Sequence, residues 1–289
     1  MAYSTLETIT DEAVKRWGTA HDTRLGELIT KLIPHVHEYA REVGLTHEEW
    51  LAGLNYLARV GQWSSENRAE NILLSDVMGL SMLVVMLNGK LPKGATPHTV
   101  LGPFYQEGSP RLEAGRNMAE GHSAEPCFIA GTVRSLDGGP IADAILDVWQ
   151  ADDEGLYEVQ LEAKDGPYLR GVYRTGPDGR YLVRTIAPLG YSIPMDGPVG
   201  ELIGMSDISH FRPAHIHFLI SAPGHQTVIT HLFKRGADYL DNDAVFAVKE
   251  ELIADFARHE AGMAPTGERV EMPFWTLEYD FVLAPEEKI

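Results

Sequence analysis

Arg-Pro-Ala-His-Ile-His-Phe, residues 212–218, alternates from one side chain to the next with a period of two. A strand with this alternation places Ala214, Ile216 and Phe218 on one face and both histidines on the other. Paired imidazoles on a strand suit zinc, copper or iron, because neutral imidazole is a borderline ligand and the strand fixes the spacing. The stretch therefore predicts a strand that carries a candidate metal site, with two ordinary histidines as the alternative.

The period of two recurs through the second part of the chain. Further segments that alternate or are rich in β-branched residues cover 128–133, 144–150, 172–175, 181–186, 228–233 and 275–282. Turn signals lie between them, as in Asp-Gly-Gly-Pro at 137–140 and Gly-Pro-Asp-Gly at 176–179. The pattern predicts a mainly antiparallel β-sandwich, interrupted by one helix over residues 243–259.

The first part of the chain has a helical period instead. Apolar residues recur at spacings of three and four between Asp11 and Asn88. Thr46 followed by Glu49 has the form of a capping box, and Gly44 marks the end of the preceding helix. Glycine and proline then end the helical pattern before residue 103. We expect an α+β protein with a helical domain and linker at 1–100 and a β-sandwich domain at 101–289.

Charge and cysteine content exclude several kinds of partner. The chain has 24 Lys and Arg against 42 Asp and Glu, a net charge of -18 that repels nucleic acids and anionic membranes. Cys127 is the one cysteine, so an internal disulfide and a zinc site of several thiolates are both excluded. No secretion signal and no run of 18 or more apolar residues is found. We expect a soluble, cytoplasmic protein.

Two tyrosines bear on the identity of the metal. Tyr157 and Tyr191 both lie in loops that follow predicted strands. A phenol, with a pKa of about 10, binds metals weakly unless a highly charged ion displaces its proton, so two tyrosines with two histidines select ferric iron. Tyrosines that only pack, and a zinc site of three histidines that includes His231, stay open on the residues alone.

Several motifs together resemble a known family. They are Val-Trp-Gln-Ala-Asp at 148–152, Gly-Leu-Tyr at 155–157, Gly-Tyr at 190–191, Arg-Pro-Ala-His-Ile-His at 212–217 and Ser-Ala-Pro-Gly-His at 221–225. In order and spacing they resemble the intradiol dioxygenases of the catechol and hydroxyquinol branch, over nearly the whole chain. That branch has a helical N-terminal domain followed by a β-sandwich.

The resemblance implies a non-haem Fe(III), one per subunit, held by Tyr157, Tyr191, His215 and His217 with a hydroxide in the fifth position. Tyr191 would be the tyrosinate that leaves when a diol chelates the iron. Arg212 would lie over the ring and stabilise negative charge there. The reaction consumes O2 and yields a muconate.

The resemblance also suggests the substrate. Residues that match pocket positions of hydroxyquinol-cleaving relatives are Leu73, Asp76, Val100, Leu101, Gly102, Pro103, Phe104, Ile193, Pro194, Arg212, His231 and Val245. Asp76 is costly beside a benzene ring unless it binds an additional hydroxyl, as hydroxyquinol (1,2,4-trihydroxybenzene) carries. His231 and Ile193-Pro194 also depart from the catechol pattern. We therefore expect hydroxyquinol as the substrate, with catechol or a chlorocatechol as the alternative.

Other expectations concern partners and rival classes. Family analogy suggests a homodimer joined through the N-terminal helices, with a lipid-like molecule between them. A transthyretin-like β-sandwich that binds ligands without catalysis, and a zinc hydratase, are the alternatives from other classes. Iron content separates them from a dioxygenase.

Overall fold

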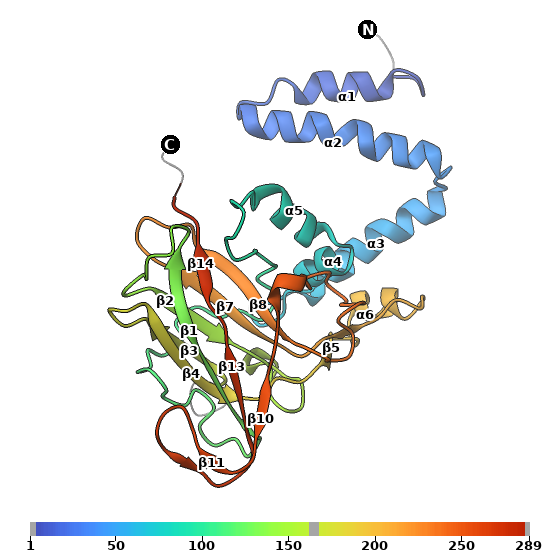
Figure 1. Ribbon diagram of the computed structural model, residues 1–289. Helices are drawn as coiled ribbons and strands as arrows, with labels where there is room; N and C mark the ends of the chain where they lie inside the picture. Colours follow the sequence, from blue (N-terminus) through green and yellow to red (C-terminus); the bar gives the residue numbers. More distant parts are fainter. Residues whose placement is uncertain (1–3, 162–167, 287–289) are drawn as a thin grey trace. The chain divides into compact units, whose positions relative to one another are not determined.

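The computed structural model describes residues 4–161 and 168–286 (Figure 1). The chain divides into two compact units, Met1–Ala58 and Arg59–Ile289. The unit that contains the sheets thus begins well before residue 100, and the expected division at that residue stays a prediction.

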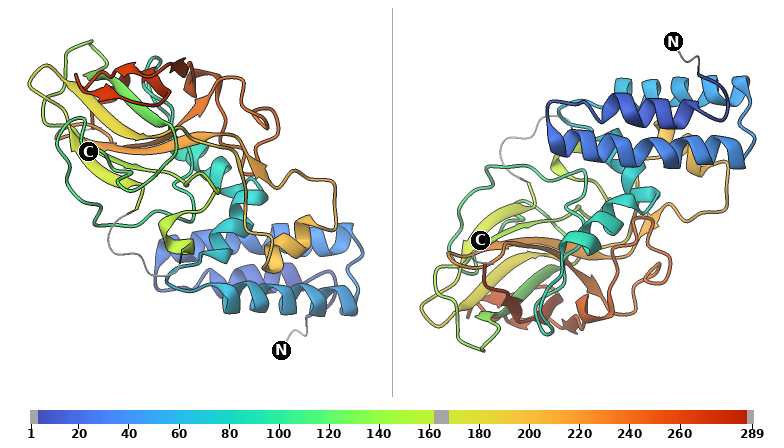
Figure 2. Two further views of the ribbon diagram at one scale, coloured as in Figure 1. Left: turned by 90° about the horizontal axis from the view of Figure 1, so that it is seen from below. Right: turned by 90° about the horizontal axis from the view of Figure 1, so that it is seen from above.

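The first unit contains α1 (Ile9–Trp17), α2 (Thr23–Glu42) and most of α3 (His47–Trp63). Helices α1 and α2 lie side by side in both Figures 1 and 2, and Arg41 of α2 donates hydrogen bonds to the Leu6 carbonyl and to Thr10. The predicted capping box is confirmed, because Glu49 N donates to Thr46 Oγ1 at 3.2 Å and Thr46 N donates to Glu49 Oε2 at 2.9 Å.

The second unit adds three short helices, α4 (Glu70–Val77), α5 (Leu80–Asn88) and α6 (Pro198–Ile203). The buried Glu70 of α4 accepts hydrogen bonds from Arg68 and from the backbone of Val199 in α6, which joins these two helices. Among the described residues no single helix is long and apolar enough to cross a membrane; α4 and α5 meet those criteria only as a pair bent by 78°.

Two five-stranded sheets form the rest of the second unit. The first has the order β10 (Ala257–His259), β13 (Phe274–Glu278), β1 (Pro126–Ser135), β14 (Phe281–Leu283), and β4 (Arg180–Ile186) pairs with β1. The second has the order β3 (Arg170–Arg174), β2 (Ile145–Trp149), β7 (His215–Ser221), β8 (Val228–Lys234), β9 (Ile253–Ala254). Two small ribbons pair β5 (Tyr191–Ser192) with β6 (Phe211–Arg212) and β11 (Gly262–Met263) with β12 (Arg269–Val270).

Side chains from both sheets share one core. Ile129 and Val133 of β1 pack in the same apolar cluster as Leu146 and Val148 of β2 and the alternate residues Ile216, Phe218 and Ile220 of β7. The predicted alternation of β7 is therefore confirmed, and the histidines point to the opposite face of the strand. Most strand pairs are antiparallel, whereas β1–β13, β1–β14 and β8–β9 are parallel. The α+β fold class is confirmed.

The predicted helix over residues 243–259 is wrong. That stretch forms a tight turn, a short 3-10 helix (Glu250–Leu252), β9 and β10. Phe246 has a φ of +59°, which an α-helix cannot accommodate, and residues 253–254 pair with β8 instead. Pairing to an exposed strand edge outweighed the local helical pattern.

Candidate active site

The two histidines of β7 present their Nε2 atoms to one point. His215 Nδ1 donates a hydrogen bond to the Pro213 carbonyl at 2.6 Å, which leaves the lone pair on Nε2. The two Nε2 atoms are 3.2 Å apart. Burial, together with the nearby Arg212 charge, holds the pKa of both imidazoles well below the ordinary value, so both are neutral. Neutral imidazole with its other nitrogen oriented by a carbonyl is the metal-binding form.

Two phenols meet these nitrogens. Tyr157 Oη lies 2.9 Å from His217 Nε2, 3.4 Å from His215 Nε2 and 3.2 Å from Tyr191 Oη. Tyr157 follows β2 after a short loop, and Tyr191 begins β5. Gly155 lets the loop pass close to Tyr191, because its φ is +83° and a Cβ there would lie 2.6 Å from Tyr191 Cβ. Burial raises the pKa of both phenols, so each phenolate requires a cation beside it.

The four donor atoms have the spacing of ligands on one ion. Donors bound at the 2.0–2.1 Å typical of zinc and imidazole, at angles of 90–110°, lie about 2.9–3.4 Å apart. Tyr157 Oη lies 2.9–3.4 Å from the other three donor atoms, and the Nε2 atoms of His215 and His217 are 3.2 Å apart. The residues present therefore fit a metal ion, and the structure brings together all four expected ligands.

His231 is a third buried histidine in this region. Ring nitrogens of His215, His217 and His231 lie within 4.8 Å of one another. His231 Nδ1 is hydrogen-bonded to Thr99 Oγ1, and its Nε2 has no partner in the described part of the chain. The three histidines by themselves form a further candidate for a metal site, with wider spacing than the set that includes the tyrosines.

Stacking orients the ring of His217. Its Nδ1 has no hydrogen-bond partner among residues 4–161 and 168–286. The ring instead stacks on Trp149, with ring centroids 4.7 Å apart and an angle of 17° between the planes. On its other contacts it lies against the His231 ring, with centroids 4.1 Å apart. The sequence motif at residues 148–152 contains Trp149, but nothing in the motif indicates that its ring stacks on His217.

Arg212 lies beside the histidines. Its side chain is 3% exposed, and NH1 is 3.1 Å from His215 Nε2. Nε donates to Asp243 Oδ1 at 3.0 Å. Burial opposes the charged form of Arg212, but the Asp243 carboxylate outweighs burial and raises the pKa of the guanidinium. Asp243 was missed because it stood at the start of the wrongly predicted helix, although Asn-Asp is typical of turns.

A pocket of about 780 Å³ opens beside the tyrosines. Its wall includes Phe104, Tyr191, Ile193 and Pro194. Phe104 stacks on Tyr157 with ring centroids 4.6 Å apart, and Gly102 brings its backbone to the edge of the His217 ring, since a Cβ there would lie 3.4 Å from His217 Cε1.

The remaining expected pocket residues are mostly buried. Leu73, Val100 and Val245 are buried, and Leu101 and Pro103 are partly buried. Asp76 of α4 is 1% exposed, and within the described residues neither carboxylate oxygen has a hydrogen-bond partner of normal geometry. Burial raises the pKa of Asp76 to about 6, against the opposing effects of Ser81 and Arg212. An unpaired buried carboxylate of this kind can bind a ligand hydroxyl.

Comparison with known proteins agrees with this geometry. Residues 100–285 match the family model described as Dioxygenase, and residues 22–96 match the model described as Catechol dioxygenase N terminus. The chain is 44% identical to 6-chlorohydroxyquinol 1,2-dioxygenase of Cupriavidus pinatubonensis over 96% of each chain. It is 41% identical to hydroxyquinol 1,2-dioxygenase of Nocardioides simplex, over 96% of this chain and 94% of the relative.

Solved structures show the same likeness. The hydroxyquinol 1,2-dioxygenase of Pseudomonas putida DLL-E4 superposes with a TM-score of 0.88 and 39% identity, covering 97% of this chain and 99% of that one. The likeness extends over both the helical region and the sheets. Family models, relatives and structure agree, and the chain belongs to the intradiol ring-cleavage dioxygenases, a family of enzymes that use non-haem iron.

Proposed function

We propose that the protein uses one Fe(III) per subunit, held by Tyr157, Tyr191, His215 and His217, to cleave hydroxyquinol with O2 to 3-hydroxy-cis,cis-muconate, the enol of maleylacetate. The observation that carries the proposal is that Tyr157 Oη lies 2.9–3.4 Å from Tyr191 Oη and from the two Nε2 atoms, which are themselves 3.2 Å apart. Phenolates favour a highly charged ion, so this donor set suits ferric iron better than zinc.

Four side chains perform the steps that the protein itself contributes. When bound, ferric iron supplies the Lewis acidity that makes the diol reactive toward O2. The oxygen of Tyr191 accepts a proton from one diol hydroxyl as the substrate enters. The guanidinium of Arg212, fixed 3.1 Å from His215 Nε2, places positive charge where the ring becomes electron-rich. Phe104 and Ile193 form apolar pocket walls that exclude water from the ring.

Asp76 supports hydroxyquinol over catechol. A buried carboxylate without partners is costly, and a third hydroxyl on the substrate would satisfy one of its oxygens. The names of the two curated relatives, which act on hydroxyquinol and 6-chlorohydroxyquinol, agree with this choice. Catechol has only the two hydroxyls that would bind the metal, so it has no third hydroxyl for Asp76.

The kinetic test replaces Asp76 with alanine and compares kcat/KM for hydroxyquinol and catechol. We expect a loss of about 10²-fold or more on hydroxyquinol and a much smaller loss on catechol, because only the triol loses a hydrogen bond. Asp241→Asn, an exposed carboxylate, is the control. Equal losses of kcat/KM on hydroxyquinol and on catechol would refute the recognition role.

The metal is tested by the visible spectrum and the metal content of the purified protein. A tyrosinate-to-iron absorption band that shifts on anaerobic addition of hydroxyquinol supports the four-ligand site. A colourless protein that contains zinc would instead favour the three-histidine site with His231.

We also propose a homodimer joined through the N-terminal helices. Helix α2 and its C-cap residue present a stripe of half-exposed apolar residues at spacings of three and four, namely Leu25, Leu28, Leu32, Val36, Tyr39 and Val43. A second copy, with a lipid-like molecule between the helices, would cover this stripe. Sedimentation of the wild type and of Leu32→Glu tests the dimer, and mass spectrometry of an organic extract tests the lipid.

A further inference from the structure

We propose that Asp243 is a positioning residue that holds Arg212 and the pocket wall at Val245 in register with the metal ligands. The proposal rests on the role that the proposed function gives to Arg212. Asp243 is buried, and it is not one of the four expected metal ligands.

The first support is the contact between Asp243 and Arg212. Nε of Arg212 donates to Oδ1 at 3.0 Å, and NH2 lies 3.5 Å from Oδ2, so the carboxylate faces one edge of the guanidinium. The other terminal nitrogen, NH1, is left to face His215 Nε2 at 3.1 Å. Both partners are about 97% buried, so little water competes for either charge. Asp243 therefore decides which nitrogen of Arg212 faces the reaction centre.

The second support is the turn that Asp243 organises. Its carboxylate also accepts hydrogen bonds from the backbone of Ala247 at 3.0 Å and of Val245 at 3.5 Å. The Asp243 carbonyl accepts a further bond from Phe246 N, and Phe246 has a φ of +59°, a strained conformation for an aromatic residue. The carboxylate thus stabilises an unfavourable turn that carries Val245.

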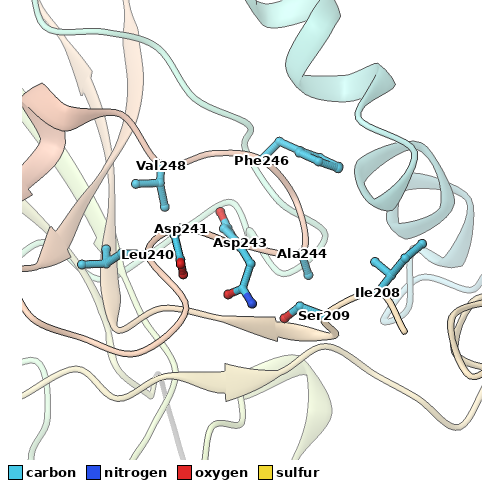
Figure 3. A pocket seen from close by; sticks show the side chains of 9 residues that line it. Ile208, Ser209, Leu240, Asp241, Asp243, Ala244, Phe246 and Val248 are labelled. Carbon is cyan, nitrogen blue, oxygen red and sulfur yellow. The ribbon is translucent and has the colours of Figure 1, made fainter. Parts of the chain in front are cut away.

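The turn is tied to the strand that carries Arg212. Ala244 N donates to the Phe211 carbonyl at 3.0 Å, next to Arg212 in β6. The segment also lines a pocket of about 440 Å³, with Asp241, Asp243, Phe246 and Val248 among its wall residues (Figure 3). One carboxylate therefore links Arg212 to the turn that carries Val245, a residue expected in the substrate pocket.

Charge balance explains why a carboxylate is required here. A buried guanidinium beside the site of a bound cation is repelled unless a negative charge compensates it. With asparagine at position 243 an oxygen can still accept a hydrogen bond, but the compensating charge is lost. Arg212 would then leave its position, and a displacement of about 1 Å can cost about 10²-fold in rate.

The experiment compares iron-loaded wild type with Asp243→Asn and with Asp241→Asn, an exposed carboxylate two residues earlier. We expect Asp243→Asn to retain its iron and its visible band while kcat falls about 10²-fold and KM changes little. Asp243→Glu, which restores the charge, should recover part of the loss. A kcat within threefold of wild type, with only a lower melting temperature, would overturn the proposal.

If Asp243→Asn is unstable, a double-mutant cycle provides the test. It compares kcat of Asp243→Asn, of Arg212→Met and of the variant that carries both changes. If Asp243 acts through Arg212, the double variant is no slower than Arg212→Met alone. Multiplicative losses would show that Asp243 acts elsewhere and would contradict the proposal. Iron content and ring cleavage of the wild type are measured in parallel, so a failure of the proposed function is distinguished from a failure of this inference.

Discussion

Replacing Asp76 with asparagine should stabilise the protein, and more so at high pH. In the folded protein the pKa of Asp76 is raised to about 6 from its ordinary value of 3.8. The folded state therefore binds this proton more tightly than the unfolded chain does. The contribution is favourable below the unfolded pKa and is lost as the pH rises through the folded pKa.

The size of the effect follows from the two pKa values. Linkage gives a penalty for the Asp76 carboxylate of about 1.6 kcal/mol at pH 5 and about 3 kcal/mol at pH 8. Asparagine, which does not titrate, removes this penalty. The stabilisation by Asp76→Asn should therefore grow by about 1.4 kcal/mol between pH 5 and pH 8.

Urea unfolding followed by tryptophan fluorescence measures the free energy of unfolding of both iron-loaded proteins at the two pH values. Metal loss on unfolding contributes to wild type and variant alike, so it cancels in the difference. Asp241→Asn, an exposed change, should show no such pH dependence. A difference between Asp76→Asn and wild type that is the same at both pH values would refute the reasoning, as would a less stable variant at pH 8.

Further predictions concern the residues around the metal site. Tyr157→Phe removes an oxygen that lies 2.9 Å from His217 Nε2, so iron content and ring cleavage should be lost together, as measured by metal analysis and oxygen uptake. Gly155→Ala introduces a Cβ 2.6 Å from that of Tyr191 and should lower kcat about 10²-fold; unchanged kinetics would show that the loop relaxes freely. Trp149→Leu removes the stacking partner of His217 and should shift the visible band and weaken iron retention during dialysis against a chelator, while unaltered retention would contradict the orienting role.

Local pattern was informative where one face of an element is buried. The alternation at residues 212–218 predicted β7 and the face that carries its histidines, because a period of two has only one arrangement against an apolar core. Thr46 and Glu49 predicted a helix start because the capping bonds are local. The loop tyrosines were joined to the histidines by family resemblance, since their positions depend on distant pairings.

Local pattern failed where long-range pairing prevails. Residues 243–259 have helical spacing, but β9 completes a sheet edge beside β8, and Asp243 is drawn into a turn by Arg212, 31 residues away. No sequence pattern predicted the ion pair between Arg212 and Asp243, because arginine and aspartate usually lie on the surface and only the fold buries these two.

From the sequence alone came the acidic charge, the type of metal-binding side chains, the family to which they point, and most of the helices and strands, with residues 243–259 as the exception. Only the tertiary structure decided that Tyr157 Oη and the Nε2 atoms of His215 and His217 meet within 2.9–3.4 Å. It also buries Asp76 so that neither carboxylate oxygen has a hydrogen-bond partner of normal geometry among the described residues, and it pairs Asp243 with Arg212. The reason is physical: side-chain types and periodicity are local properties, whereas burial and the meeting of polar groups depend on segments far apart in the chain.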